Sequence, residues 1–314
     1  MQATLKQQIC FAGAGLHSGA PVRLAILPAP VDHGIVFRRT DLEGQPLIPA
    51  LWDHVTPSKL CTLLDNGAGA TVSTVEHVMA ALAGTGIHNA LVEVDGPEVP
   101  ILDGSSAPFV AGIIEAGIRV QAAPLRAIRV LRPVELREGE AWARLVPGDH
   151  LEIDFAIDFT DAAIGHQELH LDMANGAFLR ELADSRTFCR AADVEAMQKA
   201  GLALGGTYLN AVVVDGARVL SPGGLRHRDE AVRHKMLDAV GDLALAGAPL
   251  LARYQANRAG HAMTNRLLRA LFADPTAWRW EECTPSLEGR LPGAGVAAYG
   301  PDAGLLRAMH VAAE

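Results

Sequence analysis

The stretch Arg233-His-Lys-Met-Leu-Asp-Ala-Val-Gly241 has a counterpart earlier in the chain, Glu76-His-Val-Met-Ala-Ala-Leu-Ala-Gly84. In each stretch a histidine stands seven residues before a glycine, and apolar residues recur at helical spacing. An apolar run that reads as a strand follows each of the two helices. Two unrelated amphipathic helices with alanine-rich faces would also explain so short an echo. We interpret it as an indication of two similar units.

The sequence around the two helices is consistent with such a duplication. In each half, runs that alternate apolar and polar residues come first, and helical patterns that would cover one face of a sheet follow. The link Ala122-Ala-Pro-Leu-Arg126 is the best candidate boundary, because it contains proline between a helix and a new strand. The prediction is an α+β fold with two domains, over residues 1–122 and 126–314.

Length and composition agree with two globular domains. The chain has 314 residues, of which 49% are hydrophobic and 20% charged, so global disorder is excluded. Lysine and arginine total 27 and the acidic residues total 36, which gives a formal charge of −9. A binder of nucleic acid polymers needs a positive surface, and this balance argues against one.

The cysteines and the apolar runs bear on the compartment. The four cysteines, Cys10, Cys61, Cys189 and Cys283, form no CxxC pair and read as isolated reduced thiols. We find no apolar run near the ~18 residues of a membrane-spanning helix and no signal-peptide pattern at the start. We therefore expect a cytoplasmic protein without a transmembrane segment.

The strongest local pattern is His234-Lys-Met-Leu-Asp238, which places an imidazole and a carboxylate one helical turn apart on one face. Such a pair can share one zinc ion, and Asp242 continues the same stripe. The plainer interpretation is an exposed His–Asp pair on a solvated face. The definite buried face of this helix, with Met236 and Leu237, favours the metal site.

A second helix, for which Thr74 is the expected N-cap, supplies the adjacent pair Glu76-His77. Two histidines and one carboxylate would leave a coordination position open, as in catalytic zinc sites. Glu76 would then be a base near the metal. A glutamate at a helix start is also favourable through the helix dipole alone, so this pair by itself does not settle its role.

These residues belong to a longer series of motifs that resembles the UDP-3-O-acyl-N-acetylglucosamine deacetylase family, the zinc amidases of lipid A biosynthesis. The resemblance covers about residues 6–271 and rests on these segments in this order: Gly15-Leu-His-Ser-Gly19, Phe37-Arg-Arg-Thr-Asp-Leu42, Ser73-Thr-Val-Glu-His77, Glu98-Val-Pro-Ile-Leu-Asp-Gly-Ser105, Ser185-Arg-Thr-Phe188, Val232-Arg-His-Lys-Met-Leu-Asp-Ala-Val-Gly-Asp242 and Gly260-His-Ala262.

The resemblance implies a role for each motif residue. His77, His234 and Asp238 would be the zinc ligands, which agrees with the spacing argument. Glu76 resembles the general base. His261 resembles the general acid, with Asp242 holding its ring and favouring the protonated form.

The remaining matches concern the substrate. Lys235 and Thr187 resemble groups that steady the developing oxyanion. Phe188 and the insert over about residues 186–219, including Leu202 and Gly206, resemble the apolar passage for a fatty acyl chain. Phe159 resembles an aromatic contact to uridine.

The diphosphate contact is harder to assign. Ala141 stands before Trp142 where the family pattern has a lysine, so that contact is open. A cluster of cations around His234 could surround a diphosphate: Arg226, His227, Arg228, Arg233 and Lys235.

The family implies a catalytic site at the interface of the two domains. The expected reaction is zinc-dependent hydrolysis of the N-acetyl group of UDP-3-O-[(3R)-3-hydroxyacyl]-N-acetylglucosamine, giving acetate and a free amine. Iron(II) is an alternative metal, because a His₂Asp set accepts both. We expect a monomer with a small-molecule substrate. Acyl length and the role of Cys61 stay open.

Two other functions fit parts of the pattern. One is a zinc hydrolase for a different acetylated sugar or amide, against which the apolar insert after Phe188 argues. The other is a sugar-nucleotide binding protein without catalysis. A binder needs neither a base nor an acid, so the presence of both Glu76 and His261 argues against it.

Overall fold

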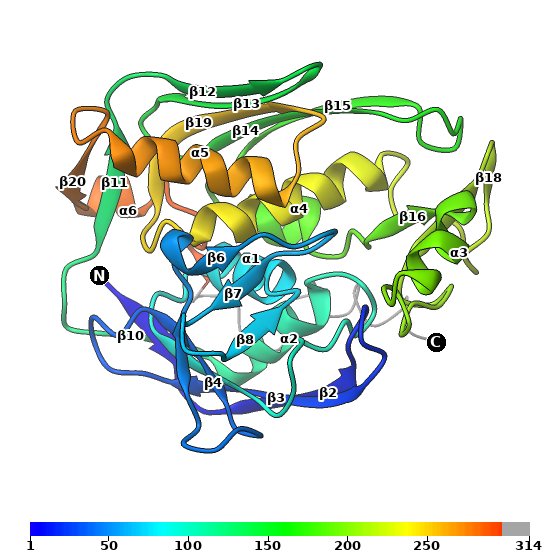
Figure 1. Cartoon of the computed structure of the whole chain (residues 1–314). Coiled ribbons are helices and arrows are strands. Elements are labelled where there is room, and N and C mark those ends of the chain that lie inside the picture. Colours follow the sequence, from blue (N-terminus) through cyan, green and yellow to red (C-terminus); the bar gives the residue numbers. More distant parts are fainter. Residues whose placement is uncertain (297–314) are drawn as a thin grey trace.

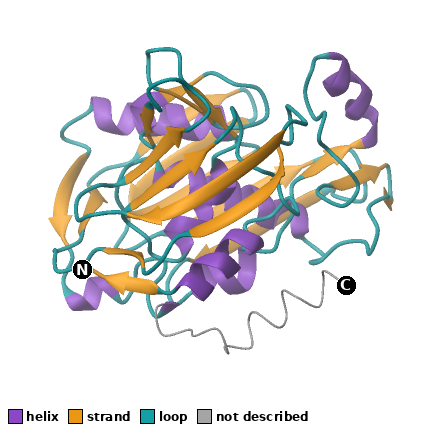
Figure 2. Ribbon diagram, turned by 90° about the horizontal axis from the view of Figure 1, so that it is seen from below, coloured by secondary structure: helices purple, strands orange, loops and turns teal. Residues whose placement is uncertain are grey.

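The computed structural model describes residues 1–296, and its architecture is α+β (Figure 1). Two β-sheets form outer layers, and helices α1 (Glu76–Gly84) and α4 (Glu230–Ala244) lie side by side between them. Figure 2 gives the view from below, with strands running across the helices. Each sheet packs one face on helices and turns the other to solvent, so buried and exposed side chains alternate along its strands.

The first sheet pairs its strands in the order β2-β3-β9-β4-β5. These are β2 (Ile9–Ala14), β3 (Pro21–Pro28), β9 (Ala90–Val94), β4 (Ile35–Arg39) and β5 (Leu47–Pro49). Strands β9 and β4 are parallel, whereas the other neighbours are antiparallel. Beside this sheet, β1 (Ala3–Leu5) pairs antiparallel with β10 (Ile118–Val120).

The second sheet repeats that order as β12-β13-β19-β14-β15, with the parallel pair, β19 and β14, at the same place. These are β12 (Val134–Glu138), β13 (Ala141–Pro147), β19 (Leu250–Asn257), β14 (Glu152–Asp158) and β15 (His166–Asp172). Strand β11 (Arg126–Val130) pairs antiparallel with β20 (Trp278–Glu282), as β1 does with β10, and also joins β19.

The helices repeat in step with the strands. Helix α1 precedes β9 and α2 (Ala107–Ala116) follows it, just as α4 precedes β19 and α5 (His261–Ala273) follows it. The fold class predicted from the sequence, two similar α+β units, is therefore confirmed. The proposed boundary at residues 122–126 falls between β10 and β11, and residues 297–314 of the second domain lie outside the described residues.

Each half carries an insertion at the same point in its order of elements. The insertion lies between β5 and α1 in the first half and between β15 and α4 in the second. The first contains a 3₁₀ turn (Trp52–His54), β6 (Val55–Thr56), β7 (Leu63–Asp65) and β8 (Thr71–Ser73). The second contains a π-helical turn (Phe178–Leu182), β16 (Phe188–Arg190), α3 (Ala191–Lys199), β17 (Val212–Asp215) and β18 (Arg218–Val219). A short helix, α6 (Pro285–Glu288), follows β20.

The N-cap predicted for α1 is wrong. Thr74 has φ +57°, and its hydroxyl donates to the Glu98 carboxylate at 2.9 Å instead of to the helix. Val75 occupies the cap position, without a side-chain cap bond within residues 1–296. A buried acceptor outside the helix therefore outcompetes the local capping bond.

Helices α1 and α4 pack closely where a glycine of α4 meets the backbone of α1. Gly241 has no room for a side chain, since a Cβ there would overlap the backbone of Glu76. One continuous apolar core then extends from the first sheet, through these helices, to the second sheet, with α1 side chains such as Met79 and α4 side chains such as Leu237 fully buried. This contact brings the start of α1 against the middle of α4.

Among the described residues, no helix combines the length and the apolar character that crossing a membrane requires.

Candidate metal centre and active site

The contact between α1 and α4 brings His77, His234 and Asp238 together. One ligand atom from each lies within 4.8 Å of the others. Oδ1 of Asp238 is 3.6 Å from Nε2 of His77 and 3.3 Å from Nε2 of His234. All three residues are buried, with at most 5% of their surface exposed. The i, i+4 spacing in α4 supplies two of these groups, and the first half of the chain supplies the third.

The donor set fits a metal ion. Oδ1 of Asp238 is buried and has no hydrogen-bond partner among residues 1–296. The ring of His234 donates from Nδ1 to the Ser185 carbonyl at 3.0 Å, which turns the lone pair of Nε2 toward Asp238. Burial lowers the pKa of His234 to about 4, so its ring is neutral, as a metal ligand must be.

Glu76 lies at the same cluster, at the first turn of α1. Its side chain is buried, and Oε2 accepts a hydrogen bond from the backbone N–H of Thr62 at 3.0 Å. Burial raises the pKa of the Glu76 carboxyl, while the nearby imidazoles of His261 and His77 oppose that rise. A buried carboxylate with a raised pKa is suited to taking up a proton.

His261 approaches from the start of α5. Its Nδ1 lies 2.9 Å from Oδ2 of Asp242, and its Nε2 lies 3.9 Å from Oε1 of Glu76 and 3.8 Å from Oδ2 of Asp238. Burial alone would lower the pKa of His261, but the three carboxylates, Asp242 foremost, outweigh it and raise the pKa to about 9. The ring is therefore protonated near neutral pH, as a proton donor must be.

Thr62, which the sequence did not single out, connects Glu76 with Asp242, the partner of His261. Its backbone N–H binds Glu76, and its hydroxyl donates to Oδ1 of Asp242 at 2.6 Å. It stands next to Cys61, a buried free thiol whose pKa burial raises to about 11. No local pattern marks Thr62, because its partner Asp242 is 180 residues away in the chain.

Lys235 points at the same cluster, with Nζ 2.8 Å from Oδ2 of Asp238. Burial would lower the pKa of Lys235, but the charges of Asp238, Asp242 and Glu76 raise it above its usual value. The same surroundings hold the pKa of Asp238 well below its usual range: burial would raise it, and His234, Lys235 and His261 outweigh burial. Lys235 is therefore a fixed positive charge at the cluster.

The cluster lines a cavity of about 930 Å³. Thr187, Phe188, Phe159 and Gly206 line this cavity, as do Lys235, His261 and the three candidate ligands. The rings of Phe159 and Phe188 meet edge to face, with centroids 5.3 Å apart.

The backbone N–H of Thr187 donates to the Gly104 carbonyl at 2.8 Å, so the first half of the chain positions this residue of the second half.

Leu202 is not among the residues that line the cavity in the described chain. The reason is local. Gly201 has φ +74° and ends α3, its N–H donating to Gln198, and the N–H of Leu202 donates to Met197 at 2.9 Å. This is a Schellman motif, in which the residue after the glycine packs on the last helical turn. The neighbouring Ala203 lines the cavity instead.

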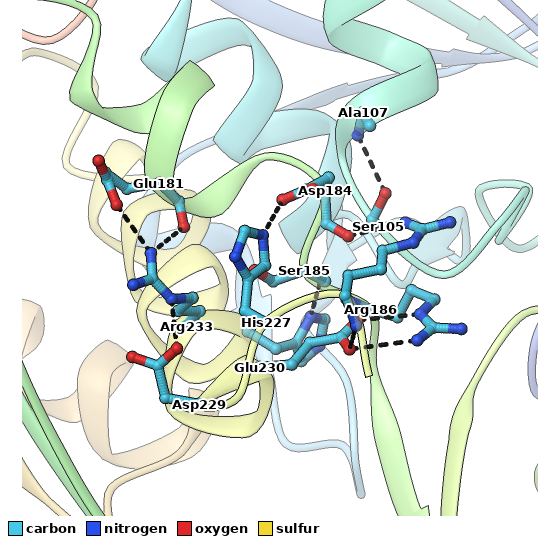
Figure 3. A network of polar contacts seen from close by, with 12 residues as sticks. Ser105, Ala107, Glu181, Asp184, Ser185, Arg186, His227, Asp229, Glu230 and Arg233 are labelled. Atoms are coloured by element: carbon cyan, nitrogen blue, oxygen red, sulfur yellow. Dashed lines mark hydrogen bonds and ion pairs between the residues drawn. The ribbon is translucent and has the colours of Figure 1, made fainter. Parts of the chain in front are cut away.

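The cations around His234 do not gather into a diphosphate site. The side chain of Arg226 pairs with Asp103 at 2.9 Å, and His227 with Asp184 at 2.7 Å. Arg233 pairs with both Asp229 and Glu181, as Figure 3 shows. The same view shows the contact between His227 and Asp184 and the ion pair between Arg186 and the buried Glu230. Of the five expected cations, Lys235 is the one that lines the cavity in the part of the chain described.

The Arg186–Glu230 pair also fixes the backbone beside the metal cluster. Oε1 of Glu230 accepts hydrogen bonds from both the backbone N–H and the Nε of Arg186, at 3.0 and 2.9 Å. Arg186 lies between Ser185, whose carbonyl orients His234, and Thr187, which lines the cavity. The Arg186–Glu230 contacts in Figure 3 therefore help to position His234, a candidate metal ligand, through the backbone of Ser185.

The fold is a duplicated α+β fold. Between its halves it buries two histidines, an aspartate, a glutamate and a further imidazole that is paired with a carboxylate. This combination defines a metal-dependent hydrolase. The family model of UDP-3-O-acyl N-acetylglycosamine deacetylase (LpxC) matches residues 2–273. The chain belongs to this family.

Curated relatives agree along nearly their whole length. The UDP-3-O-acyl-N-acetylglucosamine deacetylase of Phenylobacterium zucineum is 51% identical over 279 residues, which cover 88% of this chain and 95% of the relative. Proteins with the same name from Idiomarina loihiensis and Shewanella frigidimarina are 48% and 46% identical, over 89% and 88% of this chain and 92% and 91% of their own lengths.

Proposed function

We propose that this chain hydrolyses the N-acetyl group of UDP-3-O-[(3R)-3-hydroxyacyl]-N-acetylglucosamine, the step that commits this sugar nucleotide to lipid A. The products are acetate and the free-amine sugar nucleotide. The observation that carries the proposal is that Nε2 of His261 lies 3.9 Å from Oε1 of Glu76, beside three candidate ligands and in the lining of a largely apolar cavity. The family membership supports the same reaction.

His77, His234 and Asp238 would hold the metal ion, which we propose is zinc, with iron(II) as the alternative in the cell. When bound, the metal would polarise the amide carbonyl and make a water molecule more acidic. Three protein ligands support a catalytic and not a structural centre, because they leave a position open.

Glu76 and His261 divide the proton transfers. Glu76 accepts a proton from water as the water oxygen bonds to the acetamide carbon. The carbon–nitrogen bond then breaks, and the protonated His261 donates from Nε2 to the departing nitrogen. This donation is needed because an amine anion is a poor leaving group. Asp242 holds the ring through Nδ1 and keeps it charged.

Lys235 and Thr187 would stabilise the oxyanion of the tetrahedral intermediate. The ammonium of Lys235 is fixed by Asp238, and the backbone of Thr187 is fixed by Gly104. Groups that are already in place when charge develops contribute most to such stabilisation.

The cavity supports a substrate with a fatty acyl chain. Phe188 and Gly206 would contact the chain and Phe159 the uridine, as lining residues of one continuous space. A cavity of about 930 Å³ is large for a sugar alone and falls in the upper range of ligand sites. Leu202 would act indirectly, because its hydrogen bond to the end of α3 fixes the position of the neighbouring Ala203.

We propose that the enzyme works as a cytoplasmic monomer. One chain supplies the candidate ligands, the base and the acid, which supports activity without a second copy. Its cysteines are free thiols, as is usual for cytoplasmic proteins.

The test is acetate release from the acylated sugar nucleotide. We expect release by the purified protein, loss of release with a chelator, and recovery when zinc is added. The same sugar nucleotide without its acyl chain should be a much poorer substrate. Equal turnover of the two would indicate a hydrolase for another amide, and no release with metal present would indicate a binding protein.

A further inference from the structure

Glu98 lies in the segment after β9, outside the set of residues described so far as the reaction site. Its side chain is 2% exposed, and its carboxylate accepts three hydrogen bonds. The backbone N–H groups of His17 and Ser18 donate to Oε1 and Oε2, each at 2.8 Å, and the Thr74 hydroxyl donates to Oε1 at 2.9 Å. Glu98 therefore joins the loop between β2 and β3 to the segment that leads into α1.

The loop it holds, Gly15–Gly19, forms one wall of the cavity through Leu16 and His17. The fit around the carboxylate is tight, because a Cβ on Gly15 would overlap Oε2 of Glu98. A buried charge that is matched by three donors is expensive to disturb, and it fixes the backbone that supplies those donors.

That loop in turn holds part of the second insertion. The backbone carbonyls of Leu16 and His17 accept hydrogen bonds from the N–H groups of Gly205 and Leu204, at 3.0 and 3.2 Å. The segments touch so closely that a Cβ on Gly205 would overlap the Gly15 carbonyl. Ala203 and Gly206, on either side of this contact, line the cavity.

We propose that Glu98 is a positioning residue that holds the Gly15–Gly19 loop, and through it the Ala203–Gly206 segment, as the wall that recognises the acyl chain. It touches neither the metal cluster nor the reacting atoms. The proposal rests on the proposed function, since it assigns the wall to an acyl-bearing substrate. Loss of the Glu98 carboxylate should weaken binding of the acyl chain and leave the hydrolytic step intact.

Glu98→Gln tests this with little change in shape. An amide has one acceptor oxygen, so with Oε1 still serving His17 and Thr74 the new NH₂ group faces the N–H of Ser18, donor against donor. We expect KM for the acylated substrate to rise about tenfold, the loss expected of one hydrogen bond to a charged group, with kcat within about twofold. The low rate on UDP-N-acetylglucosamine without the acyl chain should not change.

A second readout does not depend on activity. Hydrogen exchange at the amides of Leu204 and Gly205 should become faster in Glu98→Gln, whereas the α1 amides keep their protection. If the wild type fails to release acetate, the proposed function fails, and the exchange result still decides whether Glu98 holds the insertion.

Two further variants complete the design. Gly205→Ala should push the two segments apart without touching the carboxylate and should produce the same acyl-specific defect. Asp95→Asn is the matched control: Asp95 is also a carboxylate at the end of β9 and accepts from the Arg23 N–H, away from the cavity. The proposal is overturned if Glu98→Gln lowers kcat at unchanged KM, if it affects both substrates equally, if Leu204 and Gly205 keep wild-type protection, or if Gly205→Ala alone gives the defect.

Discussion

Nδ1 of His261 lies 2.9 Å from Oδ2 of Asp242, and this pair determines the charge of the proposed acid. Asp242 is the leading cause of the raised pKa of His261, which burial alone would lower. A general acid works in its protonated form, so activity should be present below the pKa of His261 and fall as the pH rises through about 9.

Replacing Asp242 by asparagine should therefore move the basic limb of the pH–rate profile to lower pH. The amide keeps the shape of the side chain but removes the charge that raises the pKa of His261. The measurement is kcat/KM against pH for both proteins, with metal content determined alongside. A basic limb at the same pH in both would mean that another group controls it.

Glu76→Gln should lower kcat on the order of 10²–10⁴-fold, the usual contribution of a general base, and should remove the acidic limb of the profile. Zinc content should stay that of the wild type, because Glu76 is not among the candidate ligands. Glu43→Gln, at an exposed position, is the matched control and should have no effect. Full turnover in Glu76→Gln would exclude this carboxylate as the base.

Metal removal should destabilise the wild type as well as inactivate it. A ligand that binds only the folded state, at about a hundred times its Kd, stabilises by about 2.7 kcal/mol. Addition of a chelator should thus lower the Tm of the wild type but leave that of His77→Ala, which lacks one candidate ligand, unchanged. The same fall in both proteins would mean that the stabilising metal lies elsewhere.

Gly241→Ala should destabilise the protein by about 1–3 kcal/mol, because the added methyl group would overlap the backbone of Glu76 and overpack the contact between α1 and α4. Urea unfolding measures the change. The better helix propensity of alanine acts in the opposite direction, so a variant as stable as the wild type would show that the helices can separate at little cost.

Thr62→Val should leave Oδ1 of Asp242 buried without its hydroxyl donor and lower the free energy of unfolding by about 1–3 kcal/mol. The backbone bond from residue 62 to Glu76 survives in this variant, so the base stays oriented. We expect a smaller loss of kcat than in Asp242→Asn. A loss as large as in Glu76→Gln would assign the Thr62 hydroxyl a direct part in proton transfer.

The sequence predicted those parts of the fold and site that depend on short spacing. His234 and Asp238 share a helix, so their proximity follows from helical geometry alone. The two-unit fold could be predicted from one echo and from the order of strands and helices. The identical strand order of the two sheets could not, because pairing such as β9 with β4 joins distant segments.

Long-range competition explains the wrong or missing predictions. The Thr74 hydroxyl binds Glu98, 24 residues on, instead of capping α1. Thr62 gains its importance from Asp242 across the interface of the two halves. The side chains of Arg226, His227 and Arg233 find carboxylates in neighbouring loops and are not free for a diphosphate. For Arg233 one partner, Asp229, stands four residues earlier in the chain and could be predicted from helical spacing. The other partners are brought from distant segments by the fold, and the sequence around each residue does not indicate them.

The repeated strand order has a consequence for symmetry. His77 and His234 each stand seven residues before a glycine in corresponding helices, so each half of the chain brings one candidate imidazole ligand to the centre. Four residues after each histidine the sequences of the two halves differ: the second has Asp238, and the first has Ala81. The centre is therefore asymmetric: it has three candidate ligands, where two equal halves would offer two or four. A metal ion held by three such ligands would keep one coordination position open for the molecule on which it acts.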